Sequence, residues 1–148
     1  MRSNLWLIAG GTLSALAALL HVAIIFGGPG WYRFFGAGEA MARAAERGSA
    51  RPAIIAIGIA AVLLVWAAYA FSGAGAIRRL PLLRTALAAI SAVYLARALA
   101  PVPILLLWPE RMSPFVLWSS IVVLGYGIAY AVGTWTAWPA LGPVPSKR

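Results

Sequence analysis

The chain has 148 residues, of which 63% are hydrophobic and only 10% are charged, and its formal net charge is +9. Soluble domains are about 45–50% apolar and about 25% charged, so this composition excludes an ordinary water-soluble protein. The absence of cysteine excludes disulfides, iron–sulfur clusters and cysteine zinc sites. Most basic residues lie at the ends of apolar runs, which indicates contact with anionic lipid and no role in binding nucleic acid.

Four apolar runs predict an all-α, polytopic membrane protein, a four-transmembrane-helix bundle that forms a single membrane domain over residues 1–148. The expected helices cover about residues 5–27, 52–72, 82–108 and 114–138. The first run is longer than the apolar part of a signal peptide, about 7–15 residues, and is therefore expected to be retained. The second and fourth runs open with Pro52 and Pro114, and proline is well tolerated in a first helical turn.

The connection between the first two runs is rich in glycine and contains Trp31, Tyr32, Phe34 and Phe35. Aromatic side chains favour the interface between lipid and water, so this connection is expected to be a structured outer loop. Residues 41–47 are expected to form a short helix on the membrane surface.

The third run contains Arg97 and is interrupted by Pro101 and Pro103. Proline has no N–H for the carbonyl four residues back and tends to kink a helix. The carbonyls of Arg97 and Leu99 lose their usual partners, so a polar, hydrated spot is expected here.

The distribution of basic residues predicts that both termini are cytoplasmic, by a narrow margin. The inner segments would then hold six basic residues, namely Arg2, Arg78, Arg79, Arg84, Lys147 and Arg148. The outer segments would hold five, namely Arg33, Arg43, Arg47, Arg51 and Arg111.

His21 and Arg97 are the two ionisable residues well inside the spans. At about 1.5 Å per residue they lie roughly 24 Å and 18 Å from the inner edge, within about one helical turn of each other. An intramembrane charge normally faces a partner or a wet cavity. If the outer loop folds inward, Glu39 becomes the partner of Arg97. The resulting hypothesis is an outward-facing polar pocket lined by His21, Glu39 and Arg97, with Tyr94 and Ser119 as weaker candidates.

Simpler interpretations stand beside this one. Arg97 could snorkel or bond to backbone carbonyls, His21 could pack two helices together, and Glu39 could be a solvated loop acid. One histidine cannot supply two axial haem ligands, and three glutamates with one histidine make a poor metal site, so no cofactor or metal is expected. No catalytic residue is assigned.

Small residues recur at four-residue spacing in the first and fourth runs, as in Gly10 and Ser14, and in Gly125 and Ala129. Such spacing lets helix backbones approach closely in lipid. It suits a tight monomeric bundle, or else a homodimer or another membrane-protein partner.

Three stretches carry a family resemblance: residues 21–39, above all Trp31-Tyr32-Arg33-Phe34-Phe35-Gly36-Ala37-Gly38-Glu39, then Arg79-Leu80-Pro81-Leu82-Leu83-Arg84, and Val93-Tyr94-Leu95-Ala96-Arg97. They resemble small uncharacterised four-helix bacterial inner-membrane proteins. The resemblance implies a multi-pass protein of the bacterial inner membrane and supplies no mechanism.

The leading functional hypothesis is a non-catalytic protein that binds a small ligand, such as an anionic molecule or lipid headgroup, or a membrane partner through the polar pocket. One alternative is a small transporter acting as a homodimer, with His21 as the proton-coupled group. A further alternative is a lipid-modifying membrane enzyme with His21 or Glu39 as acid or base.

Overall fold

The computed structural model describes residues 4–142 and confirms an all-α bundle of four long apolar helices. The elements are α1 (Leu5–Phe34), α2 (Glu39–Glu46), α3 (Arg51–Gly73), α4 (Leu83–Leu99), α5 (Val102–Leu107), the 3-10 turn η1 (Pro109–Arg111) and α6 (Pro114–Ala137). The candidate spans are α1, α3, α6 and the combined segment Leu83–Leu107. Of the basic residues counted for orientation, Arg2, Lys147 and Arg148 lie outside the described residues.

The first helix is longer than predicted and is kinked. Gly28 has φ 69° and ψ −160°, which breaks the helical path, and α1 then continues from Pro29 to Phe34. Glycine reaches positive φ without steric cost, and proline suits the first turn of the new segment because no N–H is needed there. The glycine-rich stretch predicted to be a loop is therefore largely helical, and the irregular connection shrinks to residues 35–38.

The third span divides where its prolines predicted. Helix α4 ends at Leu99, and the short helix α5 begins at Val102, directly after Pro101. The backbone groups near this break have lost part of the regular hydrogen-bond ladder. The break therefore lies within one turn of Arg97.

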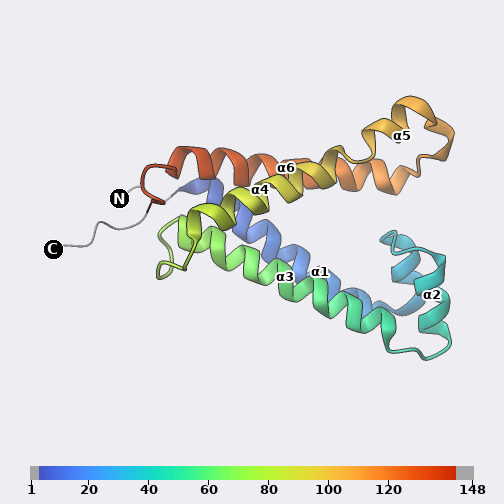
Figure 1. The fold of residues 1–148 in the computed structure, drawn as a ribbon. Helices are drawn as coiled ribbons and strands as arrows, with labels where there is room; N and C mark the ends of the chain where they lie inside the picture. Colours follow the sequence, from blue (N-terminus) through green and yellow to red (C-terminus); the bar gives the residue numbers. More distant parts are fainter. Residues whose placement is uncertain (1–3, 143–148) are drawn as a thin grey trace.

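The helices are arranged as two pairs. Figure 1 shows α1 alongside α3 and α4 alongside α6; the pairs meet where α1 begins and α6 ends, and separate toward the end that carries α2 and α5. At the closed end Leu7, Leu87 and Tyr130 are fully buried. Near the open end α2 packs against α1 through a smaller cluster of Ile24, Tyr32 and Ala42.

Two features tie α1 to α6 at the closed end. The Asn4 side chain accepts a hydrogen bond from the Leu7 N–H, which caps α1, and donates one of 2.7 Å to the carbonyl of Gly133. Gly133 lies so close to Leu7 that an added Cβ would be 2.9 Å from the Leu7 backbone nitrogen. The small residue therefore permits direct contact between the two backbones.

Large apolar side chains cover the outside of the bundle. Leu64 on α3 and Ile121 on α6 are more than half exposed, at 54% and 53%. Soluble proteins rarely expose apolar surface on this scale, whereas a lipid environment requires it. The four helices are thus built for contact with the lipid bilayer.

Candidate functional site

A buried chain of hydroxyl groups crosses the centre of the bundle. The Ser14 oxygen lies 2.8 Å from the Tyr94 oxygen and 2.9 Å from the Tyr130 oxygen, and the Tyr130 hydroxyl donates to the Trp66 carbonyl at 3.0 Å. Since each hydroxyl has one proton, the direction is determined. Tyr94 donates to Ser14, Ser14 donates to Tyr130, and Tyr130 donates to Trp66. The chain ends on a carbonyl and joins all four long helices.

Arg97 lies one helical turn beyond Tyr94 on α4, toward the open end. Its Nη1 atom donates to the Ser120 hydroxyl on α6 at 3.3 Å, a long hydrogen bond. Ser120 directs its own proton to the Val116 carbonyl at 2.7 Å, so it can only accept from Arg97. In the described part of the chain, the ion pairs all lie around α2 and none includes Arg97. The guanidinium therefore has unused donors.

A crevice of about 420 Å³ opens beside Arg97. One wall comes from Gly58, Val62 and Trp66 of α3, and the other from Tyr94 and Arg97 of α4. No atom would lie within 4 Å of a Cβ added to Gly58, so the wall is open there. The lining is almost entirely apolar apart from Arg97 and the phenol of Tyr94. The crevice thus combines an apolar trough with one cation.

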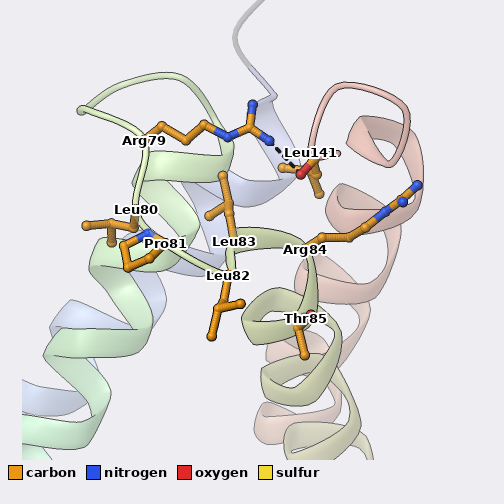
Figure 2. A pocket seen from close by; sticks show the side chains of 8 residues that line it. All are labelled: Arg79, Leu80, Pro81, Leu82, Leu83, Arg84, Thr85 and Leu141. Atoms are coloured by element: carbon orange, nitrogen blue, oxygen red, sulfur yellow. Dashed lines mark hydrogen bonds between the residues drawn. The ribbon is translucent and has the colours of Figure 1, made fainter. Parts of the chain in front are cut away.

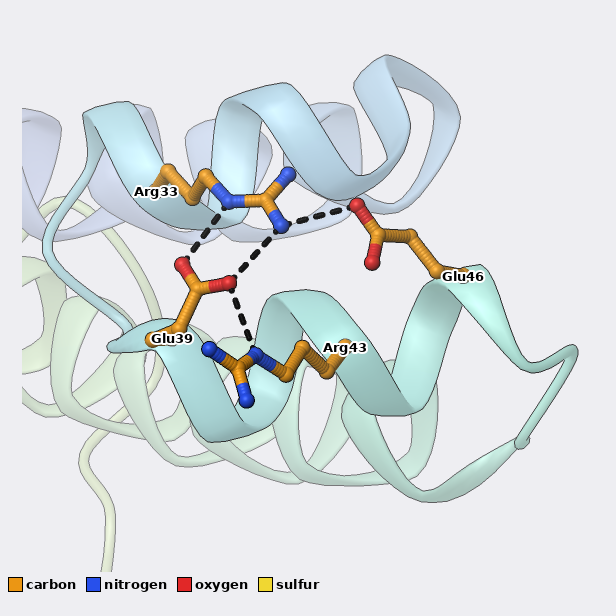
Figure 3. A network of polar contacts seen from close by, with 4 residues as sticks. All are labelled: Arg33, Glu39, Arg43 and Glu46. Carbon is orange, nitrogen blue, oxygen red and sulfur yellow. Dashed lines mark hydrogen bonds and ion pairs between the residues drawn. The ribbon is translucent and has the colours of Figure 1, made fainter.

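The structure gives Glu39 different partners from the one predicted. Figure 3 shows its carboxylate bound by Arg33, at 2.8 and 2.9 Å, and by Arg43 at 3.0 Å, while Arg33 also pairs with Glu46 at 2.8 Å. The expected pairing of Glu39 with Arg97 is therefore wrong. Glu39 instead joins the end of α1 to α2, and the arginines that do this are its neighbours in the sequence.

The remaining predicted site residues lie as follows. His21 is half-buried, and its Nδ1 atom lies 2.8 Å from the Ala17 carbonyl; a carbonyl only accepts, so Nδ1 carries the proton. His21 follows Ser14 by two helical turns and so shares the face of α1 that points toward α4 and α6. Ser119 donates to the Val116 carbonyl of its own helix. Tyr94 lines the crevice and takes part in the hydroxyl chain.

Sequence reasoning missed three of these residues as contributors to the site. Ser14 was noted only for its size, and Tyr130 and Ser120 were not singled out. The available signal was spacing, because polar groups seven residues apart, such as Ser14 and His21, recur on one face of a helix. Their cross-helix partners depend on how the helices pack.

The α2 network predicts a pH response. Hydrogen bonds from Arg33 and then Arg43 lower the pKa of Glu39 from 4.5 to about 2. A lowered pKa means that the network's contribution to stability is present above pH 4.5 and is lost as the pH falls toward 2. We expect corrected hydrogen-exchange protection of α2 to be constant from pH 8 to 5 and to fall below about pH 4.5.

Two variants test this assignment. In Glu39→Gln the acid-induced loss of α2 protection should disappear, whereas Glu110→Gln should retain it. Because Glu39 is half exposed, added salt should weaken the effect. An identical acid response in the wild type and in Glu39→Gln would show that Glu39 does not hold α2.

Four apolar helices of spanning length, with an apolar exterior and a polar centre, define the chain as a multi-pass integral membrane protein. Comparison with protein-family models, curated proteins and solved structures gives no match. The four-helix membrane architecture implied by the resemblance is confirmed, and no family is identified.

Proposed function

We propose that the protein is a non-catalytic membrane protein that binds an anionic amphiphile in the crevice between α3 and α4. Arg97 contacts the anionic head, and the apolar walls contact the hydrocarbon chain. The protein resides in the bacterial inner membrane with both termini in the cytoplasm, which places Arg97 in the outer half of the bilayer. A fatty-acid carboxylate has the chemistry and the size for this position.

The observation that carries the proposal is the poorly satisfied guanidinium of Arg97. A guanidinium has five N–H donors, and among residues 4–142 Arg97 uses one of them in a bond of 3.3 Å to a neutral hydroxyl. A charged arginine near the middle of a span costs about 2.5–3.5 kcal/mol on insertion scales. A carboxylate would offset part of this cost by accepting two parallel hydrogen bonds from the guanidinium.

The other predicted pocket residues have graded roles in this proposal. Tyr94 forms part of the wall, and its hydroxyl is committed to Ser14. His21 and Ser119 remain secondary candidates for the lining. Glu39 holds α2 and leaves Arg97 free for an external anion.

The test is the binding of oleate to the purified protein in a non-ionic detergent, measured by native mass spectrometry. We expect Arg97→Ala to weaken oleate binding by about tenfold or more, because it removes the cation of an otherwise apolar crevice and leaves the carboxylate unpaired. The oleate affinity of Arg97→Lys should lie between those of the wild type and Arg97→Ala, because lysine keeps the charge but lacks the paired N–H donors of the guanidinium.

Arg111→Ala is the matched control, since Arg111 is an exposed arginine outside the crevice. It should bind oleate as the wild type does. If Arg97→Ala remains folded and binds oleate with unchanged affinity, the proposal fails.

The transporter alternative draws on one further observation. His21 lies on the same face of α1 as Ser14, whose hydroxyl bonds to α4 and α6, so it is on the side of α1 that faces the other helix pair. Four helices enclose little space, so transport would require two copies. Native mass spectra of the membrane-extracted protein that contain only monomer would contradict this alternative.

A further inference from the structure

A second cavity lies at the closed end of the bundle, between the α3–α4 connection and the end of α6. Its volume is about 630 Å³, and it is lined by residues 79–85 together with Leu141. Figure 2 shows Arg79 and Arg84 on either side of it, with Leu82 and Pro81 forming the apolar part of the wall. The cavity is therefore amphipathic, with cations at its rim.

The arginines are held in place by contacts that leave their charge unbalanced. Arg79 donates to the carbonyls of Ala140, Leu141 and Gly142, at 3.1 Å and 2.5 Å to the first two. Arg84 lies 4.0 Å above the ring of Trp138 and donates to its carbonyl at 3.2 Å. Neutral carbonyls and an aromatic ring position a guanidinium without cancelling its charge.

The positive charge beside this cavity has no acidic counterpart in an ion pair among residues 4–142. The Nε atom of Arg84 is buried and has no hydrogen-bond partner among residues 4–142. No acidic residue lies in the first turn of α4, and no side chain caps it. The three glutamates of the chain, Glu39, Glu46 and Glu110, lie in α2 and η1, beyond the far ends of the long helices.

The surroundings favour a lipid as the source of the anion. Trp138 is 40% exposed, and Trp135, one turn before it, is 82% exposed; tryptophan marks the headgroup level of a bilayer. Leu82 projects an apolar side chain, 79% exposed, beside the cavity. A phospholipid at this level would place its phosphate near the arginines and its first acyl carbons against leucine and proline.

We propose that the cavity formed by residues 79–85 and Leu141 binds the phosphate of an anionic phospholipid. The phosphate accepts hydrogen bonds from Arg84 and attracts Arg79, and the glycerol and upper acyl chains contact Pro81 and Leu82. This site is separate from the Arg97 crevice and does not depend on it.

The test compares phosphatidylglycerol with phosphatidylcholine as adducts of the full-length protein in native mass spectrometry. The wild type should retain phosphatidylglycerol at least fivefold more tightly, which is the contribution expected from one arginine near a membrane surface. Arg84→Gln should lose most of this preference. Arg84→Lys should retain part of it, because it keeps the charge.

Arg51→Gln is the matched control, since it removes an exposed arginine at the opposite end of the bundle. It should keep the wild-type preference. An equal loss in Arg51→Gln and Arg84→Gln would reduce the effect to net charge and overturn the site. If Arg84→Gln does not fold, the absence of a phosphatidylglycerol preference in the wild type would overturn the site. Competition by inorganic phosphate alone, as strong as that by lipid, would assign the cavity to a soluble anion.

Discussion

Replacing Gly133 with alanine is expected to destabilise the folded bundle by about 1–3 kcal/mol, the usual cost of forcing an extra carbon into a packed interior. The new Cβ would lie 2.7 Å from the Leu7 side chain and 2.9 Å from its backbone nitrogen. A flexible side chain could turn away, but a backbone atom within a helix cannot. The two helices would therefore have to separate where the helix pairs meet.

Gly125 provides the control within the same helix. No atom would lie within 4 Å of its added Cβ, so Gly125→Ala should leave stability unchanged or raise it by about 0.5–1 kcal/mol through the better helix propensity of alanine. Both variants can be compared with the wild type by reversible unfolding in mixed detergent micelles. Equal stability of the two variants would contradict the close approach of α1 and α6.

Replacing Ser14 with alanine is expected to lower the free energy of unfolding by about 1–2 kcal/mol, which is the upper range for polar contacts between membrane helices. The change removes the hydroxyl that accepts the hydrogen bond from Tyr94 and donates one to Tyr130. Both phenols lie in the interior, away from water that could replace the missing partner. The Tyr94 hydroxyl would be left without an acceptor beside the crevice.

Ser119→Ala is the matched control for this change, because the Ser119 hydroxyl bonds only to a carbonyl of its own helix. Ser119→Ala should change the free energy of unfolding by no more than about 0.5 kcal/mol, as for surface substitutions in general. The measurement is again unfolding in mixed micelles. Comparable losses for the two serines would show that the central hydroxyl chain does not link the helices energetically.

These variants also separate stability from binding. Ser14→Ala acts on a wall of the Arg97 crevice through Tyr94, whereas Gly133→Ala acts at the closed end. Oleate binding should therefore be more sensitive to Ser14→Ala than to Gly133→Ala. The phosphatidylglycerol preference should depend on Arg84.

Arg97 lies within the third candidate span, as predicted, and Pro101 correctly marked the end of its regular helix. The partner of Glu39 was wrong because depth along a helix says nothing about distance across the bundle. Arg33 and Arg43 lie six and four residues from Glu39, so pairing with them closes only a short stretch of chain and costs little conformational entropy.

The amino-acid sequence alone specifies the class of the protein, since long apolar runs can satisfy their backbone polar groups in lipid only as helices. It also determined where the third helix breaks, because proline removes a hydrogen bond wherever it lies in a helix. Helix packing, in contrast, is what brings Ser14 to Tyr94 and Tyr130, places Arg97 beside an apolar crevice, and brings Arg79 to the segment that follows α6. These contacts depend on the rotation and crossing of helices, which are set by the packing of many small residues at once.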